Sequence, residues 1–204
     1  MIAPLQRPMF VVFEGLDGTG KTTIARSTAA LIGATYSTTP SPALRTYRDR
    51  IIDTLGPSPE AHQLFYLSTV FAASDEARMV LGQGRSMVID RYFLSTQAYA
   101  AFRGSRLDLD HLGKLLLPAD VTVVLEAPLH VRRSRVASRG SSAADSETLL
   151  QTADMRLREE HVTRFDGPAI GRVLRVDSSS ASPEHIARSV AVELAGIAAQ
   201  RALD

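Results

Sequence analysis

The sequence predicts an α/β fold in which a parallel β-sheet is covered by helices on both faces. Short, nearly continuous apolar runs, such as residues 10–13 and 121–125, are typical of strands that are buried on both faces. Longer segments of helical composition separate these runs, and such an alternation is typical of a parallel sheet. Five strands are expected, at residues 9–14, 34–38, 86–90, 121–126 and 172–176.

Glycine and proline mark where the intervening helices end. Gly33 follows the first helical segment, Gly56-Pro57 stops another, and Gly82 and Gly84 stop a third. Helices are expected at residues 21–32, 43–55, 59–81, 94–102, 109–116, 128–138, 148–165 and 184–203. Because no long linker interrupts the alternation, residues 1–204 are expected to form a single domain.

The composition argues against several classes of protein. Of 204 residues 45% are hydrophobic, and the net charge of +1 argues against a surface devoted to nucleic acid or anionic lipid. The absence of cysteine excludes disulfides, thiol catalysis and cysteine-ligated zinc. No apolar run approaches the roughly 20 residues of a membrane span, and residues 1–8 lack the apolar stretch of a signal peptide. We therefore expect a cytoplasmic protein with no nucleic-acid or membrane partner.

The most specific motif is Gly15-Leu-Asp-Gly-Thr-Gly-Lys21-Thr22, which has the G-x-x-x-x-G-K-[ST] pattern of a phosphate-binding loop, or P-loop. Its glycines let the backbone wrap around phosphate oxygens, and the following helix points its positive end at them. Lys21 would reach the β- and γ-phosphates of ATP, and the Thr22 hydroxyl can bind Mg²⁺. The alternative is a glycine turn with an incidental lysine. The loop joins a buried strand to a helix, so we predict the P-loop NTPase fold.

A second candidate site follows the strand expected at residues 86–90. Asp90 and Arg91 stand at its carboxyl end, where parallel sheets bind ligands. Asp90 is a candidate to hold the Mg²⁺ water shell or to orient the attacking oxygen. Arg91 is a candidate to clamp a phosphate with its planar fork. The alternative is an Asp–Arg pair that only caps the strand.

Arginine is concentrated in one short segment. It contains Arg132, Arg133, Arg135 and Arg139, of which the first, third and fourth share a face at helical spacing. Crowded like charges repel one another unless an anion compensates them. Together with the small polar residues that follow, they predict a short arginine-rich lid at residues 132–146 that closes over the transferring phosphoryl group. The alternative is a solvated basic helix face.

Taken together, these residues resemble the thymidylate kinase family of nucleoside monophosphate kinases. The similarity extends in order over nearly the whole chain. It includes the P-loop at residues 13–23, Asp90-Arg91-Tyr92 followed by Ser95 and Ala98-Tyr99, the lid start at residues 135–140, and the adenine-side loop Val176-Asp177-Ser178.

The resemblance implies that ATP with Mg²⁺ phosphorylates a (deoxy)pyrimidine monophosphate: dTMP, dUMP/UMP or dCMP/CMP. Asp17 would meet the acceptor sugar hydroxyl, Phe65 would stack on the base, Arg91 would hold the acceptor phosphate, and Tyr99 would press on the 2′ position. The acceptor set implied is Asp17, Phe65, Arg91, Thr96 and Tyr99. The ATP-binding set is Gly15, Asp17, Gly18, Thr19, Gly20, Lys21, Thr22, Thr23, Arg132, Arg135, Asp177 and Ser178. The catalytic residues would be Lys21, Asp90, Arg91, Arg135 and Arg139, and Mg²⁺ would be held by Thr22 and Asp90. Homodimers are common in the family.

The middle of the chain departs from standard thymidylate kinases, which usually carry an arginine beside a proline after the second strand and another on the next helix. Here these segments read Thr38-Thr39-Pro40-Ser41-Pro42 and, at residues 64–74, LFYLSTVFAAS. They are more similar to the mitochondrial UMP–CMP kinase branch of the fold.

The departure leaves the acceptor open. One alternative is a kinase of this fold that phosphorylates a neutral hydroxyl of a nucleoside or specialised metabolite, since a dianion otherwise lacks charge partners. Another is a non-catalytic nucleotide sensor, which the retained Lys21, Thr22 and Asp90 argue against. Arg45, Arg48 or Arg50 is a candidate replacement for the missing arginine, and a solvated helix face is the alternative for each.

Overall fold

The computed structural model describes residues 5–140 and 147–200. Its five strands form one sheet in which all neighbours run parallel, as predicted. In spatial order the strands are β2 (Thr35–Thr38), β3 (Met87–Asp90), β1 (Phe10–Gly15), β4 (Val121–Glu126) and β5 (Arg172–Asp177). The central strand β1 is buried along its whole length, because helices cover both faces of the sheet.

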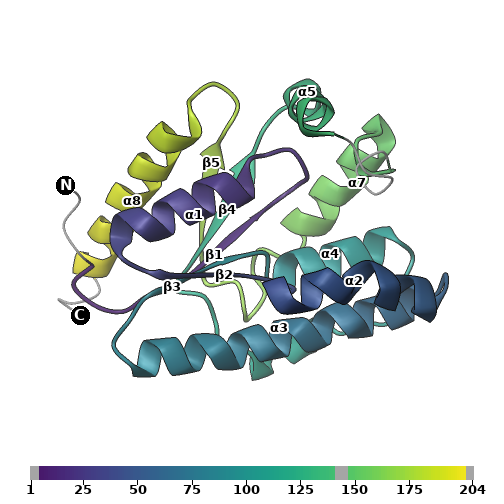
Figure 1. Ribbon diagram of the computed structural model, residues 1–204, viewed down its shortest axis with the longest axis horizontal. Coiled ribbons are helices and arrows are strands. Elements are labelled where there is room, and N and C mark those ends of the chain that lie inside the picture. The colour runs from purple at the N-terminus through teal and green to yellow at the C-terminus, as the bar shows by residue number, and fades with distance from the viewer. Residues whose placement is uncertain (1–4, 141–146, 201–204) are drawn as a thin grey trace.

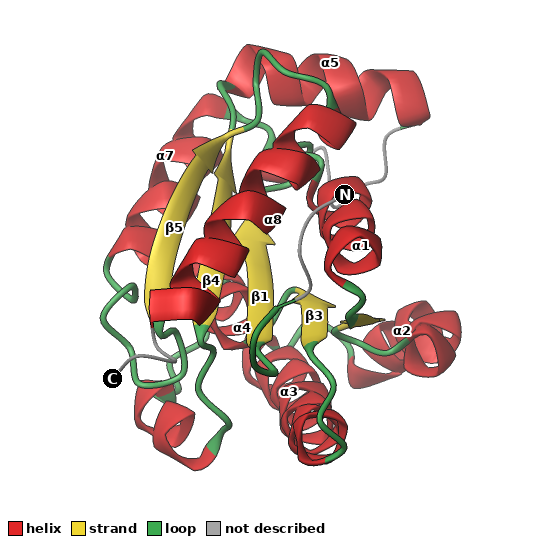
Figure 2. Ribbon diagram, turned by 90° about the vertical axis from the view of Figure 1, so that its left-hand side faces the viewer, coloured by secondary structure: helices red, strands yellow, loops and turns green. Residues whose placement is uncertain are grey.

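Helices α1 (Lys21–Ile32) and α8 (Pro183–Gln200) pack side by side over one face of the sheet (Figure 2). Ile24 of α1 and Leu194 of α8 share a buried cluster with Phe13 of β1 and Val123 of β4. The side chains of a strand alternate between faces, so Phe13 belongs to this core while Val12 belongs to the opposite one.

The opposite face is covered by α3 (Pro59–Gly82) and α4 (Phe93–Phe102), which contribute Leu67, Val70 and Phe93 to a second core. Phe10 of β1 meets the ring of Tyr92 edge-on, with 5.2 Å between centroids. Helix α7 (Gln151–Val162) packs along α4, as Figure 1 shows. The predicted layers, helices on both faces of a five-stranded parallel sheet, are therefore confirmed.

Several element boundaries differ from the sequence-based expectation. Residues 109–116 form a 3₁₀ helix, η1 (Asp110–Leu115), since a short segment containing Gly113 ends before an α-helix can propagate. Helix α5 (Leu129–Arg139) lies one residue later than expected, α7 begins three residues later, and residues 201–204 lie outside the described part of α8. Ser41 caps the start of helix α2 (Pro42–Leu55), since its hydroxyl accepts from the Leu44 N–H. The helix buries none of its residues.

The topology brings the carboxyl ends of β1, β3 and β4 to one edge of the sheet. From β1 the chain builds β2 and β3 on one side and β4 and β5 on the other, so the order reverses at β1. Such a reversal leaves a crevice where α/β proteins bind ligands. Within residues 5–140 and 147–200, no helix is both long and apolar enough to cross a membrane.

Candidate active site

The P-loop leaves β1 and begins α1 through three glycines with positive φ, Gly15 (137°), Gly18 (82°) and Gly20 (86°). A Cβ atom on Gly18 would lie 2.7 Å from the carbonyl oxygen of Arg132, so α5 packs directly on the loop. Gly20 precedes α1, and no side chain caps that helix start. The first N–H groups of the helix have no partner within it, which leaves them suited to phosphate oxygens.

Lys21 is buried beneath the loop with 6% of its surface exposed, and its Nζ donates to the carbonyl oxygen of Leu16 at 2.8 Å. Burial and the positive charge of Arg91 lower the pKa of Lys21 to about 8, although Asp17 and other carboxylates oppose this shift. Burial and the Arg91 charge thus outweigh the carboxylates that surround the ammonium. An anion placed there would stabilise its charged form.

Asp90 at the end of β3 lies beside the start of α1. The Thr22 hydroxyl donates to Asp90 Oδ2 at 2.5 Å, while Asp90 Oδ1 is buried with no hydrogen-bond partner in the described structure. Oxygen ligands of this kind suit Mg²⁺. Among the residues described, no group of three or more carboxylate or histidine side chains is placed to hold a metal. An ion here would therefore take its remaining ligands from nucleotide phosphates and water.

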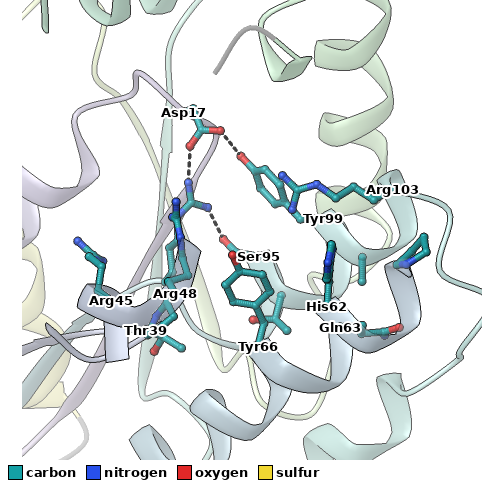
Figure 3. A pocket seen from close by; sticks show the side chains of 15 residues that line it. Asp17, Thr39, Arg45, Arg48, His62, Gln63, Tyr66, Ser95, Tyr99 and Arg103 are labelled. Atoms are coloured by element: carbon teal, nitrogen blue, oxygen red, sulfur yellow. Dashed lines mark hydrogen bonds and ion pairs between the residues drawn. The ribbon is translucent and has the colours of Figure 1, made fainter. Parts of the chain in front are cut away.

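Asp17, on the P-loop, links the loop to α4, as Figure 3 shows. Its Oδ1 accepts from an Arg91 nitrogen at 2.5 Å, and its Oδ2 accepts from the Tyr99 hydroxyl at 2.9 Å and from the Thr148 hydroxyl at 3.1 Å. Burial alone would raise the pKa of Asp17, but the charges of Arg91 and Lys21 outweigh burial and hold it well below its ordinary value. Burial and the Asp17 charge raise the pKa of Tyr99, so the phenol remains a donor.

Glu14 fixes the turn that carries Arg91. This fully buried carboxylate accepts from the backbone N–H of Tyr92 at 2.9 Å and of Ser95 at 3.1 Å, and also from the Ser95 hydroxyl. Burial raises its pKa despite these hydrogen bonds. Arg91 adopts a φ of 70°, an uncommon value for a residue other than glycine. Glu14 thus stabilises the start of α4 and the strained residue before it, a role that its place inside an apolar strand did not reveal.

A cavity of about 260 Å³ opens beside Asp17, between α2, α3 and α4 (Figure 3). It is lined by Asp17, Thr39, Pro40, Arg45, Arg48, Pro59, His62, Gln63, Tyr66, Arg91, Ser95, Thr96, Tyr99, Ala100 and Arg103. Four of these residues are arginines and only one is a carboxylate. The walls therefore carry a formal excess of three positive charges when histidine is neutral.

Comparison with known proteins gives the family. The family model for thymidylate kinase matches residues 13–173, most of the chain. The chain belongs to the thymidylate kinase family. It is 31% identical over 140 residues to the probable thymidylate kinase of Archaeoglobus fulgidus, covering 65% of this chain and 71% of that protein. It is 33% identical over 155 residues to the thymidylate kinase of Solidesulfovibrio magneticus, covering 68% and 74%.

The fold agrees with this assignment. The solved structure of thymidylate kinase from Candida albicans superposes with a TM-score of 0.69 at 18% identity and covers 94% of both chains. As a member of the family, the protein is an ATP-dependent nucleoside monophosphate kinase. Family membership thus favours an enzyme over the non-catalytic sensor considered above.

The resemblance to thymidylate kinases predicts that Phe65 stacks on the base, but its neighbour Tyr66 is the aromatic residue of α3 on the cavity wall. Tyr66 lines the cavity, whereas Phe65 is not among its lining residues and contacts Tyr66 with 5.2 Å between ring centroids. Neighbouring residues on an α-helix differ in direction by about 100°, so Phe65 and Tyr66 point to different sides of α3. Thr96 and Tyr99, which the resemblance assigns to acceptor binding, both line the cavity.

Two of the three candidate arginines on α2 reach the cavity. Arg45 and Arg48 line it, whereas Arg50 does not. The fourth cavity arginine, Arg103, was missed by the sequence reasoning. It follows Tyr99 by four residues and lies over its ring at 5.6 Å, so helical spacing from Tyr99 was the signal that could have found it.

The arginine cluster does not form one exposed face. Arg132, expected on the lid and in the ATP site, is completely buried, because it packs inward against the P-loop and α7. Arg133 donates to the Leu149 carbonyl oxygen at 2.9 Å, and Arg139 is exposed at the end of α5. The rest of the expected lid, residues 141–146, lies outside the described residues.

Arg135 connects the predicted lid start with the predicted adenine-side loop. It donates to the Ser178 carbonyl oxygen at 2.6 Å, and the buried Ser178 hydroxyl donates to the carbonyl oxygen of Thr19 at 2.8 Å. Asp177 is exposed, and its carboxylate accepts from the Ser179 N–H at 2.8 Å. The structure thus brings Arg135 and Ser178 to the P-loop, while Asp177 points to solvent and Thr23 lies exposed on the first turn of α1.

Proposed function

We propose that this kinase transfers the γ-phosphoryl group of ATP to the 5′-monophosphate of a pyrimidine deoxynucleoside, with dTMP as the first acceptor to test. The observation that carries the proposal is the excess of positive charge on the cavity beside the P-loop. The names of the relatives, thymidylate kinases, point to the same acceptor.

The charge of the cavity favours a phosphorylated acceptor over a neutral alcohol. Asp17 neutralises Arg91 directly, and the partner of Arg103 is Glu147, at 3.7 Å. Arg45 and Arg48 enter from α2, a helix without buried residues, and Arg48 pairs with Asp49 at 2.6 Å. A phosphate dianion would add charge-assisted hydrogen bonds to these arginines, whereas a neutral hydroxyl would leave the positive excess on the cavity walls unchanged.

On the donor side, Lys21 would exchange its bond to the Leu16 carbonyl for the β- and γ-phosphates. Thr22 and Asp90 would hold Mg²⁺ together with the nucleotide, and the ion, when bound, neutralises charge on the transferring group. Arg135 and Arg139 would approach the phosphates from α5. Arg135 and Ser178 would flank the adenine side, next to Asp177.

On the acceptor side, Arg91 would hold the phosphate and Asp17 would accept from the sugar hydroxyl. Tyr99 would limit space at the 2′ position, and Tyr66 replaces Phe65 as the aromatic side chain for the base. The attacking oxygen of a monophosphate is already anionic, so positioning and charge neutralisation, rather than a general base, would carry the reaction.

A coupled assay of ADP release tests the proposal, with dTMP, dUMP, dCMP, UMP, CMP and the nucleosides thymidine and deoxycytidine as acceptors. We expect at least one pyrimidine monophosphate to exceed its own nucleoside by roughly 30-fold or more in kcat/KM. A nucleoside or other neutral alcohol accepted better than every monophosphate would replace this proposal with the neutral-hydroxyl kinase.

We further propose that the chain forms a single kinase domain and that two copies of the chain associate as a homodimer. Helix α2 exposes 61% of Tyr47 and 37% of Leu44, and α3 exposes 52% of Leu64. Exposed apolar side chains on neighbouring helices are typical of surfaces that a second subunit covers. Sedimentation equilibrium measures the mass directly, and a strictly monomeric protein at micromolar concentration would contradict this part of the proposal.

A further inference from the structure

We propose that Arg132 is a positioning residue that holds Asp17 of the P-loop in the orientation needed by the acceptor. Its guanidinium joins the backbone of Asp17 to Asp154 on α7. The inference rests on the proposed role of Asp17 in acceptor binding, and it assigns Arg132 a role other than direct contact with ATP.

Arg132 is the largest fully buried side chain of the described structure, with 0% of its surface exposed. Its Nη1 donates to the carbonyl oxygen of Asp17 at 3.0 Å, and its Nη2 donates to Asp154 Oδ1. The backbone of Arg132 also fills the space that a side chain at Gly18 would need. One residue of α5 therefore contacts the P-loop with both its main chain and its side chain.

Asp154 is shared with a second arginine. Its Oδ2 accepts from Arg158 Nε at 3.0 Å, and Arg158 Nη2 donates to the carbonyl oxygen of Ala127 at 2.8 Å. The network thus connects the P-loop, α5, α7 and the segment just after β4. Each carboxylate oxygen has its own arginine, so Asp154 holds Arg132 in one orientation.

The stability of the fold does not explain this arrangement. A buried ion pair gains little over well-packed apolar residues, because removing two charges from water costs about as much as their attraction returns. What Arg132 supplies, and an apolar residue cannot, is a directed donor to the Asp17 carbonyl. The rigid guanidinium directs separate N–H groups at a carboxylate and a carbonyl at once, whereas a lysine ammonium is a compact point charge on a flexible stem.

A fixed Asp17 backbone matters because its side chain is central to the proposed acceptor site. The carboxylate binds Arg91 at 2.5 Å and Tyr99 at 2.9 Å. A displacement of the loop backbone would move the carboxylate, and Arg91 with it, relative to the acceptor phosphate. Small misplacements of this kind lower turnover without removing any group that contacts the substrate.

The test replaces the pair by apolar residues, R132M with D154L. This double variant removes both charges of the buried pair together. Arg158 loses its carboxylate partner but is 38% exposed and keeps its bond to the Ala127 carbonyl oxygen, so the variant is expected to fold with a Tm close to that of the wild type. We expect kcat/KM for the acceptor to fall about tenfold, while KM for ATP stays within about threefold. R164M is the matched control, because Arg164 is a part-buried arginine that pairs with Asp110 and Glu160 away from the cavity. R164M should lower the Tm, but it should not lower kcat/KM for the acceptor while leaving KM for ATP unchanged.

R132K covers the case in which the double variant does not fold. It keeps a positive charge for Asp154 but offers a single ammonium, and we expect a three- to tenfold loss in acceptor kcat/KM. Unchanged acceptor kinetics in either folded variant, or equal losses for acceptor and ATP, would overturn the proposal. A wild-type enzyme that phosphorylates no monophosphate would instead refute the proposed function, so the two failures are distinguishable.

Discussion

The P-loop and the cavity proposed to bind the acceptor meet at Asp17 but are built in different ways. The P-loop is contiguous, from Gly15 to Thr22, and its shape depends on positive-φ glycines that the sequence displays directly. The cavity is assembled from residues between Asp17 and Arg103 that lie on the P-loop, the β2–α2 turn, α2, α3 and α4. Local sequence therefore defines the donor site, whereas packing defines the acceptor site.

The two regions also differ in electrostatics. In the loop, Lys21 has a carbonyl partner and Thr22 a carboxylate partner, while the first N–H groups of α1 have no side-chain cap. The cavity instead gathers four arginines around one carboxylate. Although Asp49 and Glu147 pair with Arg48 and Arg103, the cavity walls themselves keep a positive excess that an anionic acceptor would reduce.

Removing Lys21 tests the donor side and should have the largest effect. K21M should lower turnover by about 10²- to 10³-fold, because it removes a fixed charge from the transferring phosphates. The same variant should raise the free energy of unfolding by about 1–3 kcal/mol, since burial lowers the Lys21 pKa to about 8 and its charge is costly in the free protein.

Lys114 is the matched control for that variant, because it is the only other lysine of the chain and lies exposed on η1. K114M should leave both turnover and Tm unchanged. Steady-state kinetics and thermal unfolding give both readouts. An active K21M would refute the assignment of the donor loop.

Arg91 tests the acceptor side. R91Q should lower kcat/KM for the monophosphate by roughly 30- to 150-fold, corresponding to about 2–3 kcal/mol for a lost charge-assisted pair, while KM for ATP remains nearly unchanged. Assays with the monophosphate and with its matching nucleoside show whether Arg91 acts through the acceptor phosphate or through another part of the site. If both acceptors lose equally, Arg91 does not act through the acceptor phosphate.

The two α2 arginines on the cavity wall, Arg45 and Arg48, test the cavity separately from the P-loop, because neither belongs to the loop. R45Q and R48Q should each raise the acceptor KM by about 3- to 10-fold through loss of partly solvated charge. R50Q, on the same helix but outside the cavity, should not. Titration of acceptor KM against salt concentration provides a second check, because screening should reduce the difference between R45Q and R50Q.

The smallest effect on turnover is expected at His161, which lies between the two regions. It meets the Tyr99 ring edge-on at 6.2 Å and lines a 160 Å³ cavity together with Gly15 and Thr19. Burial lowers its pKa to about 4 from the ordinary 6.5, so the unfolded chain takes up the proton first as pH falls. Stability is therefore complete above pH 6.5 and falls by up to about 1.4 kcal/mol per pH unit between 6.5 and 4.

H161F should remove this part of the pH dependence and leave turnover at neutral pH nearly unchanged. Urea unfolding at pH 7 and at pH 5 measures it directly. An equal loss of stability in wild type and H161F between these two pH values would assign the dependence to other groups.

The sequence by itself determined the layered fold and the P-loop. It also placed Asp90 and Arg91 at the carboxyl end of β3 and Tyr99 on the helix that follows. Apolar runs, helical spacing and glycine conformation are local properties, so they can be read along the chain. Tertiary structure alone decided which of Phe65 and Tyr66 faces the cavity, which arginines line it, and that Arg132 turns inward to Asp154. These outcomes depend on helix rotation and on contacts between residues far apart in sequence, such as Arg132 with Asp17, which lie 115 positions apart. Charge and spacing on one helix do not specify the neighbour against which that helix packs, and that neighbour decides whether an arginine binds substrate or supports the loop.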